Sequence, residues 1–175
     1  GAFGVDVGIL GTSFMYGFRE REVIFDLFEE VAGDRMMYAY FRVGGLAWEV
    51  TDNFVERVHQ VLASVRQGIV DFDGLLTQNE IFQARTRGIG HISAADAIDW
   101  GMSGPSLRAT GVPLDIRRDE PYLLYPQVKF DVITGEHGDV FDRYHCRLRE
   151  MTESVKIIEQ SLDKLRPGAI LPERM

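Results

Sequence analysis

Asp6 is the first candidate for chemistry in this sequence, because it is the one charged residue of an apolar stretch. Residues 1–18 read GAFGVDVGILGTSFMYGF, and no other side chain there ionises near neutral pH. An ionised carboxylate that is removed from water needs a partner, so Asp6 must be paired, protonated or exposed as a helix cap. The five glycines of the stretch also let neighbouring backbone or a ligand come close. The stretch itself leaves open which group, if any, pairs with Asp6.

Two further clusters place fixed charges next to glycine and proline. Arg42 precedes paired glycines in the motif YFRVGG, which indicates a close approach of backbone beside a cation. The stretch 100–122 concentrates Gly, Pro, Arg and Asp without periodicity. Because irregular backbone must be satisfied by side chains, Arg108, Asp115 and Arg117 are predicted to be structural clamps in preference to ligand-binding groups.

Residue type and spacing exclude several common chemistries. The single cysteine, Cys146, excludes an intrachain disulfide framework and any C-x-x-C metal site within the chain. No phosphate-binding glycine loop, dinucleotide fingerprint or nucleophile motif is present. The formal net charge of −8, with no basic run among aromatics, argues against a nucleic-acid partner. The four histidines lack the spacing of a metal site; they are His59, His91, His137 and His145.

Length and composition are typical of one globular domain. The chain has 175 residues, of which 45% are hydrophobic and 26% charged, enough for a core. No apolar run approaches the ~18 residues of a membrane span, and no signal-peptide pattern is visible. The chain begins within an apolar pattern and without an initiator methionine. We therefore expect residues 1–175 to be a single domain and a fragment of a longer protein.

Hydrophobic periodicity predicts two long helices in the centre and at the end of the chain. The clearest begins after Asp139, its predicted N-cap, and continues to the stop signal RPG. Another is predicted from about Asn53 to the mid-70s, with Asn53 and Glu56 as a capping box. The apolar stripes are Phe141, Tyr144, Leu148, Met151, Val155, Ile158, Leu162 and Leu165 in the first helix, and Phe54, Val58, Val61, Val65, Ile69, Phe72 and Leu76 in the second.

A third long helix is predicted over 13–32, with Gly33 as its end and its charged start RERE as a solvated face. A short helix should follow Ser93, its cap, and end at Gly101. The segment KFDVITG alternates with period 2 and predicts a strand or hairpin edge at 129–135. The fold class is therefore mainly α, a helical bundle with a small irregular β-excursion.

Three long stretches carry a family resemblance. They read VDVGILGTSFMYGFREREVIFDLFEEVAGDRMMYAYFRVGG, AIDWGMSGPSLRATGVPLDIRRDEPYLLYPQVKFDV and GDVFDRYHCRLREMTESVKIIEQSLDKL. In this order they resemble the D subunit, also called the 49-kilodalton subunit, of respiratory complex I, the proton-pumping NADH–quinone oxidoreductase. The likeness spans nearly all 175 residues and corresponds to the middle of that family's chain, without its N-terminal and C-terminal sections.

The resemblance implies a fold similar to the large subunit of nickel–iron hydrogenases and a place beside a quinone cavity. A neighbouring B-type subunit would hold the terminal iron–sulfur cluster, and this segment alone would bind no cofactor. Further implied partners are the C-type subunit, membrane-arm subunits and quinone as substrate. The implied location is peripheral, on the cytoplasmic face of the bacterial inner membrane or its organelle equivalent. NADH is the expected donor, although relatives that take electrons from ferredoxin share these motifs.

The resemblance also assigns roles to individual residues. Asp6 matches the aspartate of the family's LDIGA motif, where it would orient a proton-donating histidine from the missing N-terminal section. Phe14 matches an aromatic position near the quinone cavity, with simple packing as the alternative. Met37 stands where many members carry a histidine near the cluster; a methionine cannot bind a proton, which argues against pH-linked redox behaviour here. Arg42 matches a cluster-side arginine, and no metal ligand is implied.

Two other functional classes stay open at this point. A hydrogenase-type large subunit shares the implied fold, but its nickel–iron centre requires two C-x-x-C pairs near the chain ends. A non-catalytic helical module that only assembles partners would keep the helices without the chemistry. In all three cases the surfaces should be interfaces, so we expect exposed apolar patches.

Overall fold

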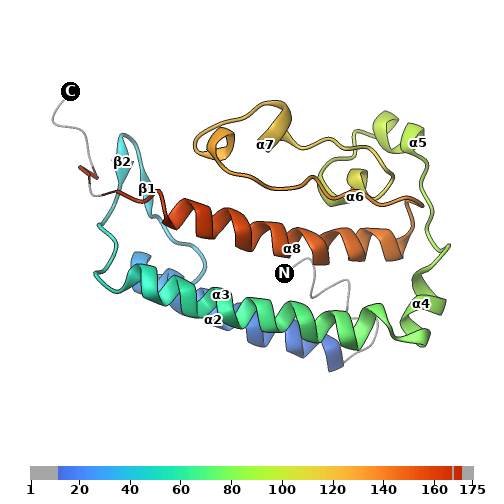
Figure 1. The fold of residues 1–175 in the computed structure, drawn as a ribbon, viewed down its shortest axis with the longest axis horizontal. Helices are drawn as coiled ribbons and strands as arrows, with labels where there is room; N and C mark the ends of the chain where they lie inside the picture. Colours follow the sequence, from blue (N-terminus) through green and yellow to red (C-terminus); the bar gives the residue numbers. More distant parts are fainter. Residues whose placement is uncertain (1–11, 167, 171–175) are drawn as a thin grey trace.

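The computed structural model describes residues 12–166 and 168–170, with side chains from residue 17 onwards. Three long helices dominate it: α2 (Thr12–Ala32), α3 (Phe54–Phe72) and α8 (Val140–Leu162). In Figure 1, α2 and α3 lie side by side, and α8 crosses the middle of the molecule above them. Short helices and loops cover the other side of α8. Within these ranges, no helix has the length and apolar character that crossing a bilayer requires.

The predicted helix at the end of the chain is confirmed as α8. Asp139 is its N-cap, and the Asp139 carboxylate accepts a hydrogen bond from the Asp142 backbone N–H at 2.8 Å. The helix ends at Leu162, three residues before the last residue of the apolar stripe, because the backbone beyond Asp163 turns into a short non-helical segment. The stop therefore precedes the RPG motif.

The other two long helices also match their predicted spans. Gly33 ends α2 with a φ of +73°, a conformation that glycine adopts without strain, and its N–H donates to the Glu29 carbonyl. The predicted capping box at the start of α3 is wrong, because the Asn53 side chain makes no capping hydrogen bond. A π-helical turn, η2 (Asp73–Thr77), extends α3 and keeps Leu76 in the core.

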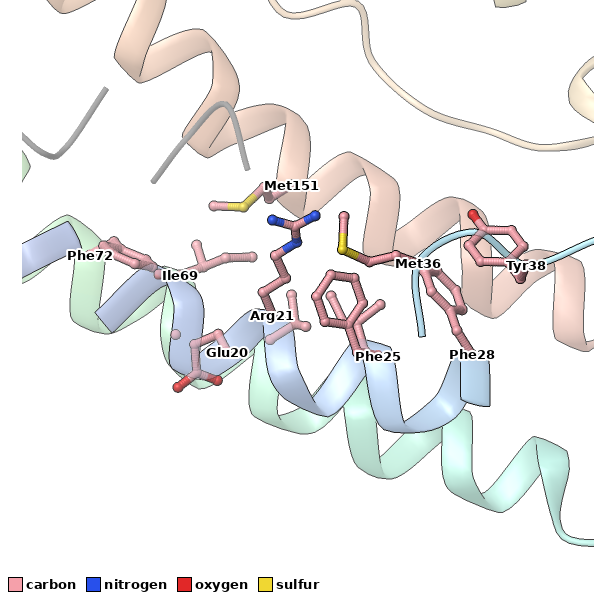
Figure 2. Close-up of a pocket in the computed structure, with 13 residues that line it drawn as sticks. Glu20, Arg21, Phe25, Phe28, Met36, Tyr38, Ile69, Phe72 and Met151 are labelled. Atoms are coloured by element: carbon pink, nitrogen blue, oxygen red, sulfur yellow. The ribbon is translucent and has the colours of Figure 1, made fainter. Parts of the chain in front are cut away.

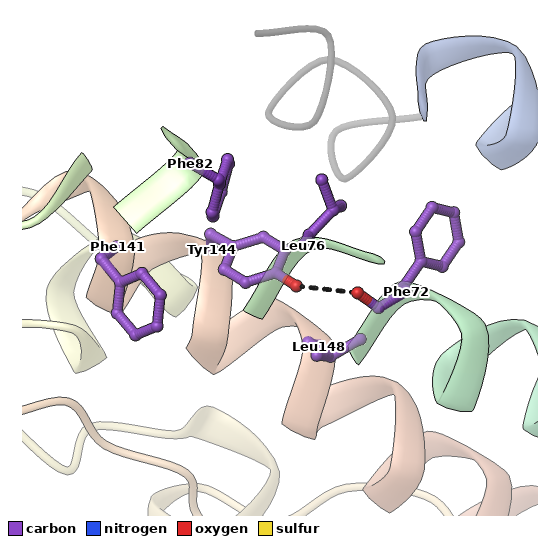
Figure 3. Close-up of a cluster of buried hydrophobic side chains, with 6 residues drawn as sticks. All are labelled: Phe72, Leu76, Phe82, Phe141, Tyr144 and Leu148. Atoms are coloured by element: carbon purple, nitrogen blue, oxygen red, sulfur yellow. Dashed lines mark hydrogen bonds between the residues drawn. The ribbon is translucent and has the colours of Figure 1, made fainter. Parts of the chain in front are cut away.

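The core forms where the apolar stripe of α8 faces α3. At one end Tyr144 packs among aromatic and aliphatic side chains, with its ring 4.8 Å from that of Phe82 (Figure 3). The Tyr144 hydroxyl lies 2.9 Å from the Thr77 hydroxyl, and burial raises the pKa of Tyr144 to about 12. At the other end α2 contributes Leu27. The two clusters comprise Phe72, Leu76, Phe82, Phe141, Tyr144 and Leu148, and Leu27, Val58, Val61, Leu62 and Val155.

The opposite, polar face of α8 binds the layer of loops and short helices. Arg143 donates to the carbonyl oxygens of Gly138 and Gly90, both at 2.9 Å. The predicted helix after Ser93 is confirmed, and Ser93 caps it. The other elements of this layer were not predicted. The layer consists of α5 (Ala94–Asp99), α6 (Gly104–Arg108), α7 (Ile116–Asp119) and the 3-10 turn η3 (Tyr125–Gln127), whereas α4 (Glu80–Thr86), which precedes it in the chain, carries the core residue Phe82.

The predicted strand at 129–135 is wrong. Phe130 and Ile133 are buried but lie three residues apart, so burial does not follow the predicted period of 2, and the segment runs along α8 instead of along another strand. Side chains of α8 replace the missing ladder: Glu153 accepts from the Asp131 N–H, and Gln160 both accepts from and donates to the Lys129 backbone. An extended segment can therefore satisfy its backbone on a polar helix face.

The small β-excursion lies elsewhere, in a hairpin of β1 (Phe41–Arg42) and β2 (Gly45–Leu46). The strands are antiparallel, with Phe41 opposite Leu46 and Arg42 opposite Gly45. Gly44 has a φ of +88° in the two-residue turn, so the second residue of the turn requires glycine. The fold class is thus mainly helical with one two-stranded sheet.

The predicted clamps are confirmed at Arg108. Its guanidinium is buried, bonds to the Glu150 carboxylate at 2.7 Å and donates to the Leu114 carbonyl at 2.9 Å. Nearby, Arg117 binds Asp115 at 2.6 Å and lowers the pKa of that carboxyl. These contacts attach the loop layer to α8.

Replacing Arg108 should destabilise the protein strongly. Arg108→Met leaves the Glu150 carboxylate, whose side chain is 17% exposed, without its partner, and we expect the free energy of unfolding to fall by about 3–5 kcal/mol. The matched control is Arg66→Met, because Arg66 pairs with Glu159 in solvent and should contribute less than about 1 kcal/mol. Urea unfolding of both variants measures the difference. Equal losses would contradict the clamp.

Candidate functional site

An apolar cavity of about 400 Å³ lies between α2, α3 and the segment that follows α2. Phe25 and Phe28 of α2 form one wall, and Met151 of α8 lies across from them (Figure 2). The volume and the mostly apolar lining fall in the range of small-molecule sites. The other lining residues are Gly17, Glu20, Arg21, Ile24, Met36, Tyr38, Val65, Gly68, Ile69 and Phe72.

The cavity contains a cation and a carboxylate from the run that was expected to be solvated. The Arg21 guanidinium lies over the Phe25 ring, 4.5 Å from its centroid (Figure 2). The Glu20 carboxylate accepts from the Ser64 hydroxyl at 2.9 Å, and the Glu20 side chain packs beside Gly68, where an added Cβ would lie 3.1 Å from Glu20 Cγ. The expectation of a solvated face is therefore wrong for these two half-buried residues, because Glu20 packs against Gly68 of α3 and Arg21 packs on the Phe25 ring.

The cluster-side candidates lie on one exposed segment, residues 36–48, which carries the hairpin. Met37 is 84% exposed, and the exposed Arg42 side chain in β1 makes no hydrogen bond or ion pair with the described residues. Val43, at the hairpin turn, is 98% exposed, and Phe41 is 77% exposed. This segment supplies one of the exposed apolar patches that the sequence predicted. Arg42 does precede the tight turn expected beside it.

The structure brings Met37 and Arg42 onto this one segment but does not test the other two predicted site residues. Asp6 lies outside the described residues. Phe14 lies in the first turns of α2, one helical turn before the cavity-lining Gly17, and its side chain lies outside the described part. The backbone register thus puts Phe14 on the helix stripe that continues to Arg21 and Phe25.

Sequence reasoning missed the cavity residues Met36 and Tyr38. No motif marks them, and their role depends on the direction in which the chain leaves α2. For the α2 wall of the cavity one signal was available: Arg21 and Phe25 are four residues apart and therefore share a helix face.

The remaining reactive side chains of the described part are not arranged for catalysis. Burial raises the pKa of the Cys146 thiol to about 11, so it stays protonated in the core. His145 stacks on the Phe141 ring, and burial together with Arg149 lowers its pKa. Among the described residues, no group of three His, Cys, Asp or Glu side chains could hold a metal ion.

Comparison with known proteins supplies what the geometry leaves open. Residues 6–175 match the model of a family described as "Respiratory-chain NADH dehydrogenase, 49 Kd subunit". The chain is 50% identical over 169 residues to the D subunit of NADH-quinone oxidoreductase from Geotalea uraniireducens, which covers 97% of this chain and 43% of the relative. It is 46% identical over 168 residues to the corresponding D 2 subunit from Sinorhizobium medicae, covering 96% and 41%. The chain thus spans less than half the length of these curated relatives.

Proposed function

The chain belongs to the family of the 49 kDa subunit of respiratory-chain NADH dehydrogenase, and from this premise we propose that it forms one wall of a quinone-reducing site. The observation that carries the proposal is the family match over residues 6–175, together with relatives named as D subunits of NADH-quinone oxidoreductase. The enzyme would be a multi-subunit NADH–quinone oxidoreductase, and these residues alone would have no turnover. Residues 1–175 would be the central part of the subunit, with a bundle similar to the hydrogenase large subunit.

In this proposal Asp6 acts beside the quinone. Its carboxylate would pair with a histidine from another section of the subunit, stay ionised and orient the imidazole that donates a proton to the reduced quinone. Phe14 would line the same cavity. Two features of the described part support this place: α2 carries Phe14, and its apolar stripe continues along a cavity lined by aromatic rings. Quinone headgroups are uncharged rings, which such a lining suits.

The exposed segment 36–48 would face the neighbouring subunit that holds the terminal iron–sulfur cluster. Its high apolar exposure at Met37, Phe41 and Val43 suits a protein interface. Arg42 would add a fixed positive charge on that side, which favours a reduced, more negative centre. Met37 cannot titrate, so redox behaviour there would not depend on pH through this residue.

The proposal places the chain at the membrane-adjacent end of the peripheral arm, on the cytoplasmic face of a bacterial inner membrane or the organelle equivalent. Its partners would be the B-type and C-type subunits of that arm and subunits of the membrane arm. Electrons would come from NADH and leave on quinone.

Binding of a quinone-site inhibitor distinguishes this function from that of a scaffold. The complete subunit that contains this chain, reconstituted with its B-type neighbour, should bind such an inhibitor, and added quinone should displace it. Isothermal titration measures both steps. A complex that assembles stably but shows no inhibitor binding would identify a non-catalytic assembly module.

A further inference from the structure

Arg35 makes contacts that no sequence motif indicates. Its guanidinium bonds to three carboxylates of α2: Glu22 at 2.5 Å, Asp26 at 2.6 Å and Glu29 at 3.0 Å. The spacings of four and three put these carboxylates on one stripe of the helix, where like charges repel. The α2 helix by itself therefore has an unfavourable row of negative charges, and the cation that compensates it comes from the next segment.

The position of Arg35 in the chain determines where that segment goes. Gly33 ends α2 and reverses the backbone, so Arg35 reaches back along the helix that it has just left. Immediately after it, Met36 enters the cavity and the Tyr38 ring packs 4.9 Å from that of Phe28 (Figure 2). The Arg35 guanidinium also lies 5.7 Å from the centre of the Phe25 ring. Charge and ring contacts thus direct the segment over α2.

The hairpin that follows is too short to be stable by itself. Each strand has two residues, and an isolated two-stranded hairpin is at best marginally stable in water. One hydrogen bond, from the Ala47 N–H to the Tyr40 carbonyl at 2.8 Å, closes its base, and the Leu46 N–H donates to the Ile170 carbonyl. Its tip, with Val43, is exposed. The order of the segment 36–48 therefore depends on contacts outside the hairpin, which are those with α2 and the bond to Ile170.

We propose that Arg35 is a positioning residue: with Glu22, Asp26 and Glu29 it forms an electrostatic clasp that holds the segment 36–48 in place. Insofar as this segment faces a neighbouring subunit, the functional part of the inference rests on the proposed function. The clasp lies in solvent, with the Arg35 side chain 37% exposed and the carboxylates more so. It must therefore weaken at high salt, because the Debye length falls to about 3 Å at 1 M.

Hydrogen exchange of the Ala47 amide tests the clasp directly. In Arg35→Gln we expect this amide to exchange about fivefold faster than in the wild type, because the base of the hairpin opens more often. Arg35→Lys keeps the charge but loses the planar fork, so it should restore part of the protection. Arg66→Gln is the matched control, because it breaks an exposed ion pair between α3 and α8 and should leave Ala47 unchanged.

Salt separates an electrostatic clasp from a packing role. Raising the salt to 1 M should accelerate Ala47 exchange in the wild type, and it should have no further effect in Arg35→Gln. The proposal is overturned if Arg35→Gln exchanges at the wild-type rate, if Arg66→Gln accelerates Ala47 equally, or if the wild type shows no salt dependence.

The functional part is tested in the intact oxidoreductase. Arg35→Gln should slow quinone reduction severalfold and leave NADH oxidation by ferricyanide unchanged, because the latter does not need the quinone site. If Ala47 exchange accelerates while quinone reduction keeps its rate, the clasp stands but the proposed place of the segment 36–48 beside that site is contradicted. If exchange is unchanged, the clasp itself is wrong, whatever the activity.

Discussion

Gly138→Ala should abolish the folded state or lower the free energy of unfolding by more than about 4 kcal/mol, an unusually large effect for one methyl group. Gly138 has a φ of +65°, and an added Cβ would clash with the Ile92 carbonyl oxygen. That oxygen is backbone and has no rotamer to change. The residue also joins two segments, because its N–H donates to the Ala109 carbonyl and its carbonyl accepts from the Ile92 N–H, both at 3.0 Å.

Gly101→Ala is the control for this prediction. Gly101 has nearly the same φ, +66°, but nothing lies within 4 Å of an added Cβ. It should therefore carry only the left-handed backbone cost of about 1–2 kcal/mol. Denaturant unfolding of both variants measures the difference. A similar loss of unfolding free energy in the two variants would mean that the Ile92 backbone moves away from Gly138 easily. That result would contradict a rigid contact between the Gly138 turn and the loop layer.

Local signals sufficed where an element is defined by its own residues. The α8 helix follows from its 3-and-4 stripe and from Asp139, and α5 follows from Ser93 and Gly101. These local signals failed where contacts with another segment decide which structure forms. The alternation of KFDVITG predicted a strand, but Phe130 and Ile133 are its buried residues, and Glu153 and Gln160 of α8 bind its backbone in place of a second strand.

The candidate site depends even more on distant partners. Arg21 and Glu20 belong to a charged run that would be solvated on an isolated helix, but both line the cavity, where Glu20 packs against Gly68 and Arg21 lies over the Phe25 ring. The three carboxylates that receive Arg35 looked like ordinary surface charge. The roles of Asp6 and Phe14 came from the family resemblance, because residue spacing shows that an apolar stretch contains one carboxylate but not what pairs with it.

Asp6→Asn should slow quinone reduction by about a hundredfold, the size of effect expected when a proton donor loses its orienting partner. The amide keeps the shape of the side chain but removes the negative charge that holds a histidine in place and stabilises its protonated form. NADH oxidation by ferricyanide should be unchanged, since it does not use the quinone site. Asp99→Asn, at an exposed residue of α5, is the control and should match the wild type in both assays.

The most direct measurement of the central claim is single-turnover quinol formation in the intact oxidoreductase after reduction by NADH. Our account predicts normal reduction by NADH in Asp6→Asn, retained inhibitor binding as a sign of assembly, and quinol formation about a hundredfold slower than in the wild type. Quinol formation at the wild-type rate in a correctly assembled Asp6→Asn enzyme would contradict the placement of this chain's Asp6 beside the reacting quinone.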